Sequence, residues 1–197
     1  MGDLASLNTL DPNVVQEVFR KSVDDPDARL LDWDHESIQV GSVGELYRFS
    51  GKIQPTAAAA APCSLVLKIQ QKWERGGDPE CWRREALVYQ SGIFDDLPGS
   101  LGVPDCYDIQ EREDETWYWF EDVTGTTAGQ FDLDHYCQAA RHLGQFQGPY
   151  IGGRPLPTYP WLSSRRWIPC FAFCQDSCEH HQVWVISAIT SSPGQKL

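Results

Sequence analysis

The chain has 197 residues, of which 41% are hydrophobic and 22% are charged, proportions typical of a protein that folds around a core and unlike those of a disordered chain. Its formal net charge of −12 would repel a phosphate backbone, so we expect no nucleic acid among its partners. Residues 1–10 lack the features of a signal peptide, and no stretch is long and apolar enough to cross a bilayer. We therefore expect a cytoplasmic protein with no membrane partner.

The first predicted elements are a helix and a β-hairpin. Asp11 and Pro12 form a helix start signal for residues 11–23, in which valine and phenylalanine recur at helical spacing. Residues 37–50 then contain two strand-like runs on either side of a glycine turn at residues 41–44. The sequence therefore predicts a leading helix followed by a hairpin.

A third strand is predicted after a loop. The stretch 54–62 is bracketed by prolines, which interrupt a strand ladder, so we place it in a turn. The residues after it alternate with the period of a strand. One face carries Leu65, Leu67 and Ile69, and the other carries Val66, Lys68 and Gln70.

A second helix and a second hairpin are predicted next. Asp78-Pro79-Glu80 is a helix start signal, and Gly92 is a stop signal. Between them, helical spacing is shown by Trp82, Ala86, Tyr89 and Ile93. Residues 103–109 and 116–120 are rich in β-forming side chains and are separated by a charged turn, which predicts two further strands.

The third predicted helix covers residues 131–148, with Asp132 or Asp134 as its cap and Gly148 as its end. One face of this helix is expected to carry Leu133, Tyr136, Ala140, Leu143 and Gln147. Four prolines fall within residues 149–160, which predicts an extended connector that joins two lobes.

Lys68 and Glu85 are the candidate functional pair. Lys68 lies on the strand face opposite the apolar residues, so its ammonium group points away from the core. Glu85 lies on the inward stripe of the second helix, where an unpaired carboxylate is costly, so we expect it to pair with Lys68. In protein kinases such a pair holds the lysine at the nucleotide phosphates. The alternative is a solvated Lys68, with Glu85 paired to Arg83 or Arg84 on the surface.

Four segments of the sequence form a recognisable set. They are Leu65-Val-Leu-Lys-Ile, Arg84-Glu85-Ala-Leu-Val-Tyr, Phe120-Glu121-Asp122 and Ala140-Arg-His-Leu-Gly-Gln-Phe-Gln-Gly, the last followed by Pro155-Leu-Pro and Pro160-Trp-Leu. Together they resemble the aminoglycoside phosphotransferase and choline kinase-like family over about residues 30–165. The resemblance implies an α+β fold: a protein kinase-like small lobe, made of a five-stranded antiparallel sheet plus a helix, followed by the first part of a helical large lobe.

The resemblance also implies a nucleotide as partner, with ATP as the cofactor, and roles for particular residues. The phosphates would be covered by backbone N–H groups of Gly41, Ser42, Val43 and Gly44, for which an ordinary hairpin turn is the alternative. Val66 would pack on adenine. Lys68, held in position by Glu85, would contact the phosphates. Glu121 and Val123 would hold adenine through their backbone, in the hinge. Trp117 and Trp119 are expected to pack within their strand.

The residues that perform phosphoryl transfer in this family have no counterpart in the sequence. The family's catalytic loop has a His-x-Asp core followed by an asparagine, and a later aspartate also binds Mg²⁺. The residues two positions after the five histidines are Ser37, Cys137, Gly144, Gln182 and Val183. We therefore predict no catalytic residue, no metal ligand and no kinase turnover by this chain alone.

The tail beyond Arg166 departs from the family. Its possible metal ligands are Cys170, Cys174, Cys178, His180 and His181. Their spacing matches known zinc sites poorly, so zinc is the lesser alternative. A truncated large-lobe helix or a shifted reading frame explains this tail more simply.

The predicted organisation has four parts: a leading helix and linker (1–30), a kinase-like lobe (31–123), a hinge with the first large-lobe helix and connector (124–166), and an unassigned tail (167–197). The leading interpretation is an incomplete ATP-dependent phosphotransferase that, when complete, acts on a hydroxyl of a small-molecule alcohol. The alternative is a non-catalytic nucleotide-binding or interaction module derived from such a kinase. A β-rich scaffold without a ligand is the third possibility.

Overall fold

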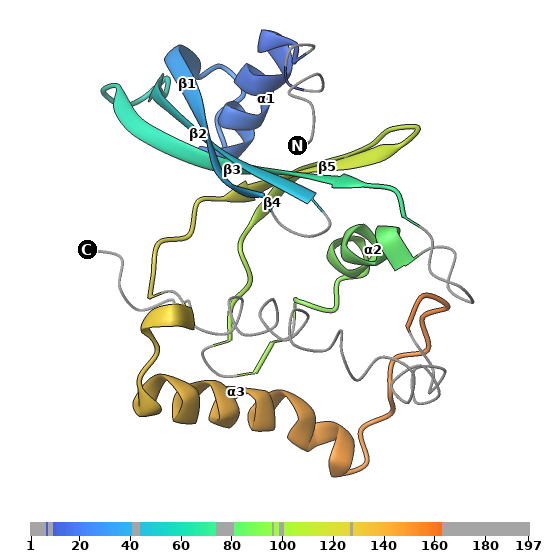
Figure 1. The fold of residues 1–197 in the computed structure, drawn as a ribbon. Helices are drawn as coiled ribbons and strands as arrows, with labels where there is room; N and C mark the ends of the chain where they lie inside the picture. The colour runs from blue at the N-terminus through green and yellow to red at the C-terminus, as the bar shows by residue number, and fades with distance from the viewer. Residues whose placement is uncertain are drawn as a thin grey trace. The chain divides into compact units, whose positions relative to one another are not determined.

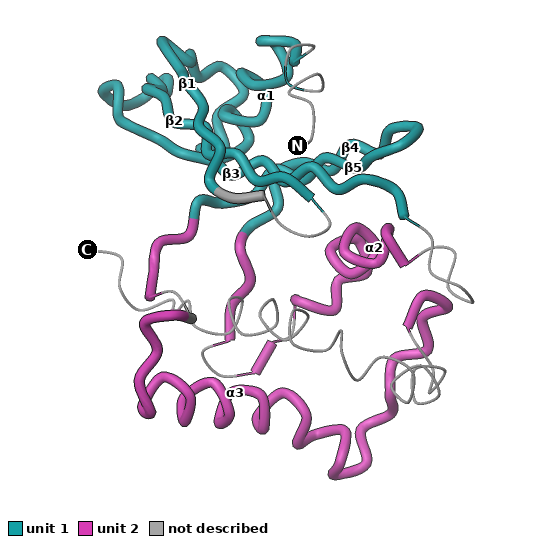
Figure 2. The backbone as a smooth tube through the Cα atoms, viewed as in Figure 1, with its two compact units in different colours: residues 1–73, 105–122 teal, residues 74–104, 123–197 magenta. Residues whose placement is uncertain are grey.

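The structure, a computed structural model, describes residues 7, 10–40, 44–73, 81–95, 97–98, 101–126 and 128–162. Its architecture is α+β, with a five-stranded antiparallel sheet (Figure 1). The chain divides into two compact units, unit 1 with residues 1–73 and 105–122, and unit 2 with residues 74–104 and 123–197 (Figure 2). The segment 31–123, expected to form one lobe, contributes to both units.

The leading helix α1 (Pro12–Ser22) begins where the sequence predicts. The Asp11 side chain accepts a hydrogen bond from the backbone N–H of Asn13 at 2.9 Å, and Pro12 takes the first helical position, where its missing N–H leaves no bond unmade. Val15, Val18 and Phe19 form its buried face and join the core of the sheet. The helix therefore belongs to unit 1 together with the strands.

The sheet contains both predicted hairpins. Its strands are β1 (Arg29–Val40), β2 (Gly44–Gln54), β3 (Ala61–Gln71), β4 (Cys106–Glu111) and β5 (Glu115–Glu121), in the order β1-β2-β3-β5-β4. All neighbouring strands are antiparallel. Several boundaries differ from the predicted ones. β1 begins at Arg29 and not at Ser37, and β2 ends at Gln54, a residue expected in the loop. Pro62, also expected in the loop, lies within β3, and β4 begins at Cys106 and not at Val103.

One face of the sheet, together with α1, forms the core of unit 1. Leu65, Leu67 and Ile69 on β3 are at most 1% exposed, which confirms the predicted alternation. Trp117 and Trp119 on β5 are fully buried, and Trp119 meets the ring of Phe49 edge-on at 4.9 Å between centroids. Both tryptophans therefore pack within the core, as expected.

Unit 2 contains η2 (Cys81–Arg83), α2 (Arg84–Gln90), η3 (Ala128–Gln130) and α3 (Leu133–Ile151). The predicted start signal of the second helix at residues 78–80 lies outside the described residues. Gly92 follows α2 with φ of +70°, a left-handed conformation that suits glycine at a helix end. None of the described helices combines the length and the apolar character needed to span a membrane.

Helix α3 begins as predicted but ends later and buries a different face. Asp132 is its cap and accepts a hydrogen bond from the backbone N–H of His135 at 3.0 Å. The helix continues through Gly148, the expected end, to Ile151. Within the predicted apolar face, Leu133 is 75% exposed and Tyr136 is 51% exposed, whereas the buried residues are Ala139 and His142. The buried stripe is therefore the neighbouring one.

Candidate functional site

Lys68 lies on the central strand of the sheet, on the face opposite the core. Directly opposite residues of antiparallel strands share a face, so the strand register defines the neighbours of Lys68. Leu46 on β2 and Tyr118 on β5 flank Lys68, and Arg48 and Phe120 flank Val66 in the same way. We call these residues the Lys68 face: Leu46, Arg48, Val66, Lys68, Tyr118 and Phe120.

The Lys68 face combines a cation with apolar and aromatic side chains. The Nζ atom of Lys68 is 5.8 Å from the ring centroid of Tyr118. The rings of Tyr118 and Phe120 are nearly parallel, at 6°, with centroids 5.8 Å apart. Val66 and Lys68 are both half-buried. Tyr118 is fully buried and Phe120 is 8% exposed, so the accessible part of this face is formed by its half-buried members, Lys68 and Val66 among them. A cation beside an apolar side chain suits a ligand that has both an anionic and an apolar part.

Only one residue of the predicted glycine turn is described by the structure. Gly41, Ser42 and Val43 lie outside the described residues, and Gly44 is the first residue of β2. A Cβ atom at Gly44 would lie 2.6 Å from the backbone oxygen of Ile69, so only glycine allows β2 to approach β3 this closely. Strand packing therefore explains Gly44 by itself, and the phosphate role of the turn stays a prediction.

Glu85 lies in the first turn of α2 and is half-buried. It belongs to unit 2, whereas Lys68 belongs to unit 1, and each unit is described by itself. The Lys68–Glu85 ion pair therefore stays a prediction. The alternative was an ion pair between Glu85 and Arg83 or Arg84. Arg84 donates its Nε–H to the backbone oxygen of Trp161 at 3.1 Å.

The two predicted hinge residues lie on either side of the boundary between the units. Glu121 ends β5, and its backbone N–H donates to the oxygen of Asp105 at 2.9 Å. Its carboxylate accepts the N–H of Asp105 at 3.3 Å. Glu121 is opposite Leu65, so its side chain is on the core side and not on the Lys68 face. Val123 is 39% exposed, and no backbone hydrogen bond joins it to another described residue.

Sequence reasoning missed an ion pair at the edge of this site. The Nε of Arg48 on β2 donates to Oδ2 of Asp122 at 2.9 Å, and Asp122 has a side chain only 8% exposed. The hydrogen bond to Asp122 raises the pKa of Arg48 above its ordinary value, with a smaller effect from Glu36, whose Oε1 is 3.2 Å from Nη1. The alternation in Tyr47-Arg48-Phe49 could have placed Arg48 on this face. Tyr47 and Phe49 point into the core, so Arg48 between them points to the other face of β2.

The described residues contain no group of three or more histidine, cysteine or acidic side chains that could hold a metal ion. The cysteine and histidine group at residues 170–181 lies outside them. No protein-family model matches the chain, and no curated protein sequence matches it. The resemblance to the aminoglycoside phosphotransferase family therefore rests on the sequence segments alone.

Proposed function

We propose that this chain is the nucleotide-holding, amino-terminal part of an ATP-dependent phosphotransferase of the aminoglycoside phosphotransferase-like type. The complete enzyme would act on a hydroxyl of a small molecule. The observation that supports this most is the position of Lys68, a half-buried cation on the central strand and on the face away from the core. The five-stranded antiparallel sheet is compatible with a kinase-like small lobe.

ATP has a flat purine and an anionic triphosphate, and the Lys68 face offers a partner for each. Lys68 would contact phosphate oxygens through charge-assisted hydrogen bonds. Val66 is two residues away on the same face, about 7 Å along the strand, and would pack on the purine. Val123 lies in unit 2, so its predicted backbone contact with the purine rests on the sequence resemblance alone. Lys68 and Val66 are the residues that would hold ATP, and the described residues offer no carboxylate cluster for Mg²⁺, to which we assign no ligand.

A non-catalytic nucleotide-binding module is the second candidate. The given sequence, which contains no His-x-Asp segment, is compatible with it. Without that loop, a bound nucleotide lacks the aspartate that positions the hydroxyl and the asparagine that helps to bind the metal. Both candidates share nucleotide binding by Lys68, and phosphoryl transfer is proposed only for a chain that also carries a catalytic loop.

Thermal unfolding of the full chain with ATP, with Mg-ATP and without nucleotide tests the shared claim. ATP should raise the Tm of the wild type, because a ligand that binds only the folded state stabilises it. Lys68→Ala should lose about 1.5–3 kcal/mol of binding, equivalent to roughly 10- to 100-fold in affinity. Lys52→Ala is the matched control, since Lys52 is an exposed lysine on β2, opposite Pro62.

The Lys52→Ala chain should respond to ATP as the wild type does. If ATP and Mg-ATP both leave the Tm of the wild type unchanged, the chain is a scaffold and the proposal is wrong. An equal response by Lys68→Ala and the wild type would also contradict it, because binding would then lie elsewhere.

A further inference from the structure

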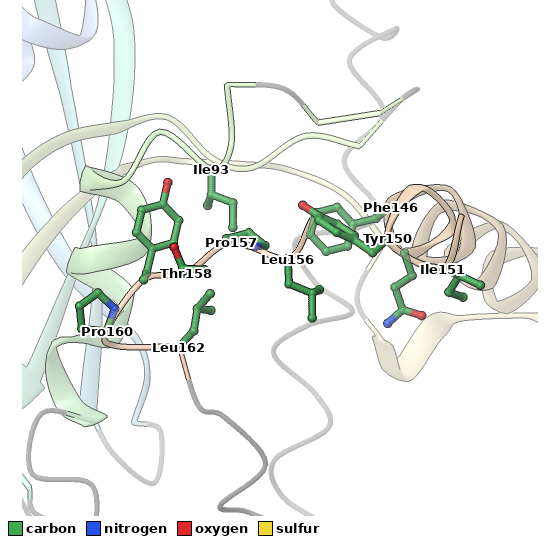
Figure 3. Close-up of a pocket in the computed structure, with 11 residues that line it drawn as sticks. Ile93, Phe146, Tyr150, Ile151, Leu156, Pro157, Thr158, Pro160 and Leu162 are labelled. Carbon is green, nitrogen blue, oxygen red and sulfur yellow. The ribbon is translucent and has the colours of Figure 1, made fainter. Parts of the chain in front are cut away.

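Unit 2 contains a pocket of about 850 Å³ that has no part in the proposed nucleotide site (Figure 3). Three segments line it: the turn after α2, the last part of α3, and the connector that follows α3. The lining residues are Ile93, Phe146, Gln147, Tyr150, Ile151, Leu156, Pro157, Thr158, Tyr159, Pro160 and Leu162. Small-molecule sites usually have volumes of about 300–1,000 Å³, so the pocket has the size of a ligand site.

The connector wall of this pocket is held in place by contacts with the α2 region. The hydroxyl of Tyr159 donates to the backbone oxygen of Ser91 at 3.1 Å. Arg84 binds the backbone oxygen of Trp161, also at 3.1 Å, and the ring of Trp161 stacks on Tyr159 with centroids 5.0 Å apart. Pro157 and Pro160 further restrict the backbone. These contacts tie the Tyr159–Trp161 part of the wall to the α2 region without any ligand.

The chemistry of the lining is neutral and mainly apolar. No described lining residue carries a charge. The rings of Phe146 and Tyr150, both lining residues from α3, meet edge-on with centroids 6.0 Å apart (Figure 3). Tyr150, Gln147 and Thr158 also carry polar groups, which form no hydrogen bond with other described residues. The nearby Arg154 contacts the ring of Tyr150, at 5.5 Å from its centroid, and is not a lining residue.

We propose that this pocket binds a neutral, mainly apolar small molecule that has a flat ring and one or two hydrogen-bonding groups. None of the described lining residues carries a charge, so an ionic group would gain no ion-pair partner from the lining in exchange for the water that it loses there. A flat ring would instead gain contacts with Phe146, Tyr150 and Leu156. The hydroxyl of Tyr150 and the polar groups of Gln147 and Thr158 would orient it. This proposal does not depend on nucleotide binding.

Titration of the full chain with 2-naphthol and with 2-naphthoate, followed by ligand-observed NMR, tests the proposal. Both probes have the same ring, but only 2-naphthoate is charged at pH 7. We expect saturable binding of 2-naphthol and binding of 2-naphthoate weaker by about tenfold or more. Absence of saturable 2-naphthol binding, or equal affinity for the two probes, would overturn the proposal.

Two blocking variants and one control locate the binding. Leu156→Trp, from the connector, and Ile151→Trp, from α3, place a bulky ring at the rim of the pocket. The control is Leu133→Trp, because Leu133 is 75% exposed, much like Leu156 at 71%, but does not line the pocket. Such exposed positions accept a larger side chain without loss of folding.

Each blocking variant should weaken 2-naphthol binding by about tenfold or more, and Leu133→Trp should leave it within about twofold of the wild type. The Tm of each variant confirms that it is folded. Unchanged binding by both blocking variants would place the probe elsewhere and overturn the proposal. If one blocking variant does not fold, the other decides the outcome.

Discussion

Replacing Arg48 with methionine removes the cation from a carboxylate that the fold holds almost out of water. The Asp122 side chain is 8% exposed and the Arg48 side chain is 37% exposed. Losing one partner of a fully buried ion pair costs about 3–5 kcal/mol, whereas an exposed pair contributes about 0–1 kcal/mol. Because one partner is buried and water reaches the other, we expect Arg48→Met to destabilise the chain by about 1–3 kcal/mol.

Urea unfolding followed by tryptophan fluorescence measures this loss, since Trp117 and Trp119 are buried in the same sheet. With a slope near 2 kcal/mol/M, the midpoint should fall by roughly 0.5–1.5 M. The matched control is Glu36→Gln, which removes the other acidic partner of Arg48. Glu36 is 67% exposed, so this change should cost less than about 0.5 kcal/mol. Equal losses for the two variants would refute the reasoning, as would a loss below about 0.5 kcal/mol for Arg48→Met.

Two further predictions concern a glycine and a helix cap. Gly44→Ala should cost about 1–3 kcal/mol in urea unfolding because its Cβ would meet the oxygen of Ile69, whereas Gly144→Ala, with open space around it, should stabilise α3 by about 0.5–1 kcal/mol. A loss of the same size at both positions would contradict the packing argument. The backbone N–H of His135 lowers the pKa of Asp132 below its ordinary value of 3.8. The stability from this cap is therefore present above about pH 4 and lost as the pH falls through the lowered pKa. The difference in Tm between the wild type and Asp132→Asn should therefore narrow between pH 5 and pH 3. A difference that stays constant over this range would contradict the stabilising role of the ionised Asp132 cap.

The parts of the fold that the sequence predicted are those determined by local physics. The alternation of Leu65, Leu67 and Ile69 predicted a strand with one buried face, because successive side chains of a strand point to opposite sides. The start of α1 followed from Asp11 and Pro12, because a helix needs a side-chain acceptor and tolerates proline only at its first turn.

Helix α3 shows where local patterns were ambiguous. Two adjacent stripes of this helix carry apolar residues, and periodicity alone does not decide which one is buried. The structure buries Ala139, whose small side chain allows close packing, and exposes Leu133. The expected end at Gly148 was wrong because the pair Gly152-Gly153, which follows Ile151, ends the helix instead. Gly153, with φ of +105°, adopts the left-handed conformation, and Gly152 donates its N–H to the oxygen of Gly148 at 2.9 Å.

The candidate site was partly accessible to sequence reasoning. Lys68 was placed on the correct face of its strand by alternation alone. The Arg48–Asp122 pair was not found, because the two residues are 74 positions apart and meet only through the strand order β2-β3-β5. The pairing of Lys68 with Glu85 is a question of how two units meet, which neither alternation nor helical spacing addresses.

The central claim is that Lys68 meets the phosphates of a bound nucleotide. An acyl phosphate derivative of ATP, which transfers its acyl group to a lysine beside the phosphates, tests this claim when the full chain is digested and the modified peptides are identified by mass spectrometry. We predict that Lys68 is acylated in preference to Lys52 and Lys72, and that free ATP suppresses this modification. Equal acylation of the three lysines, or acylation of Lys68 that free ATP does not reduce, would contradict the account.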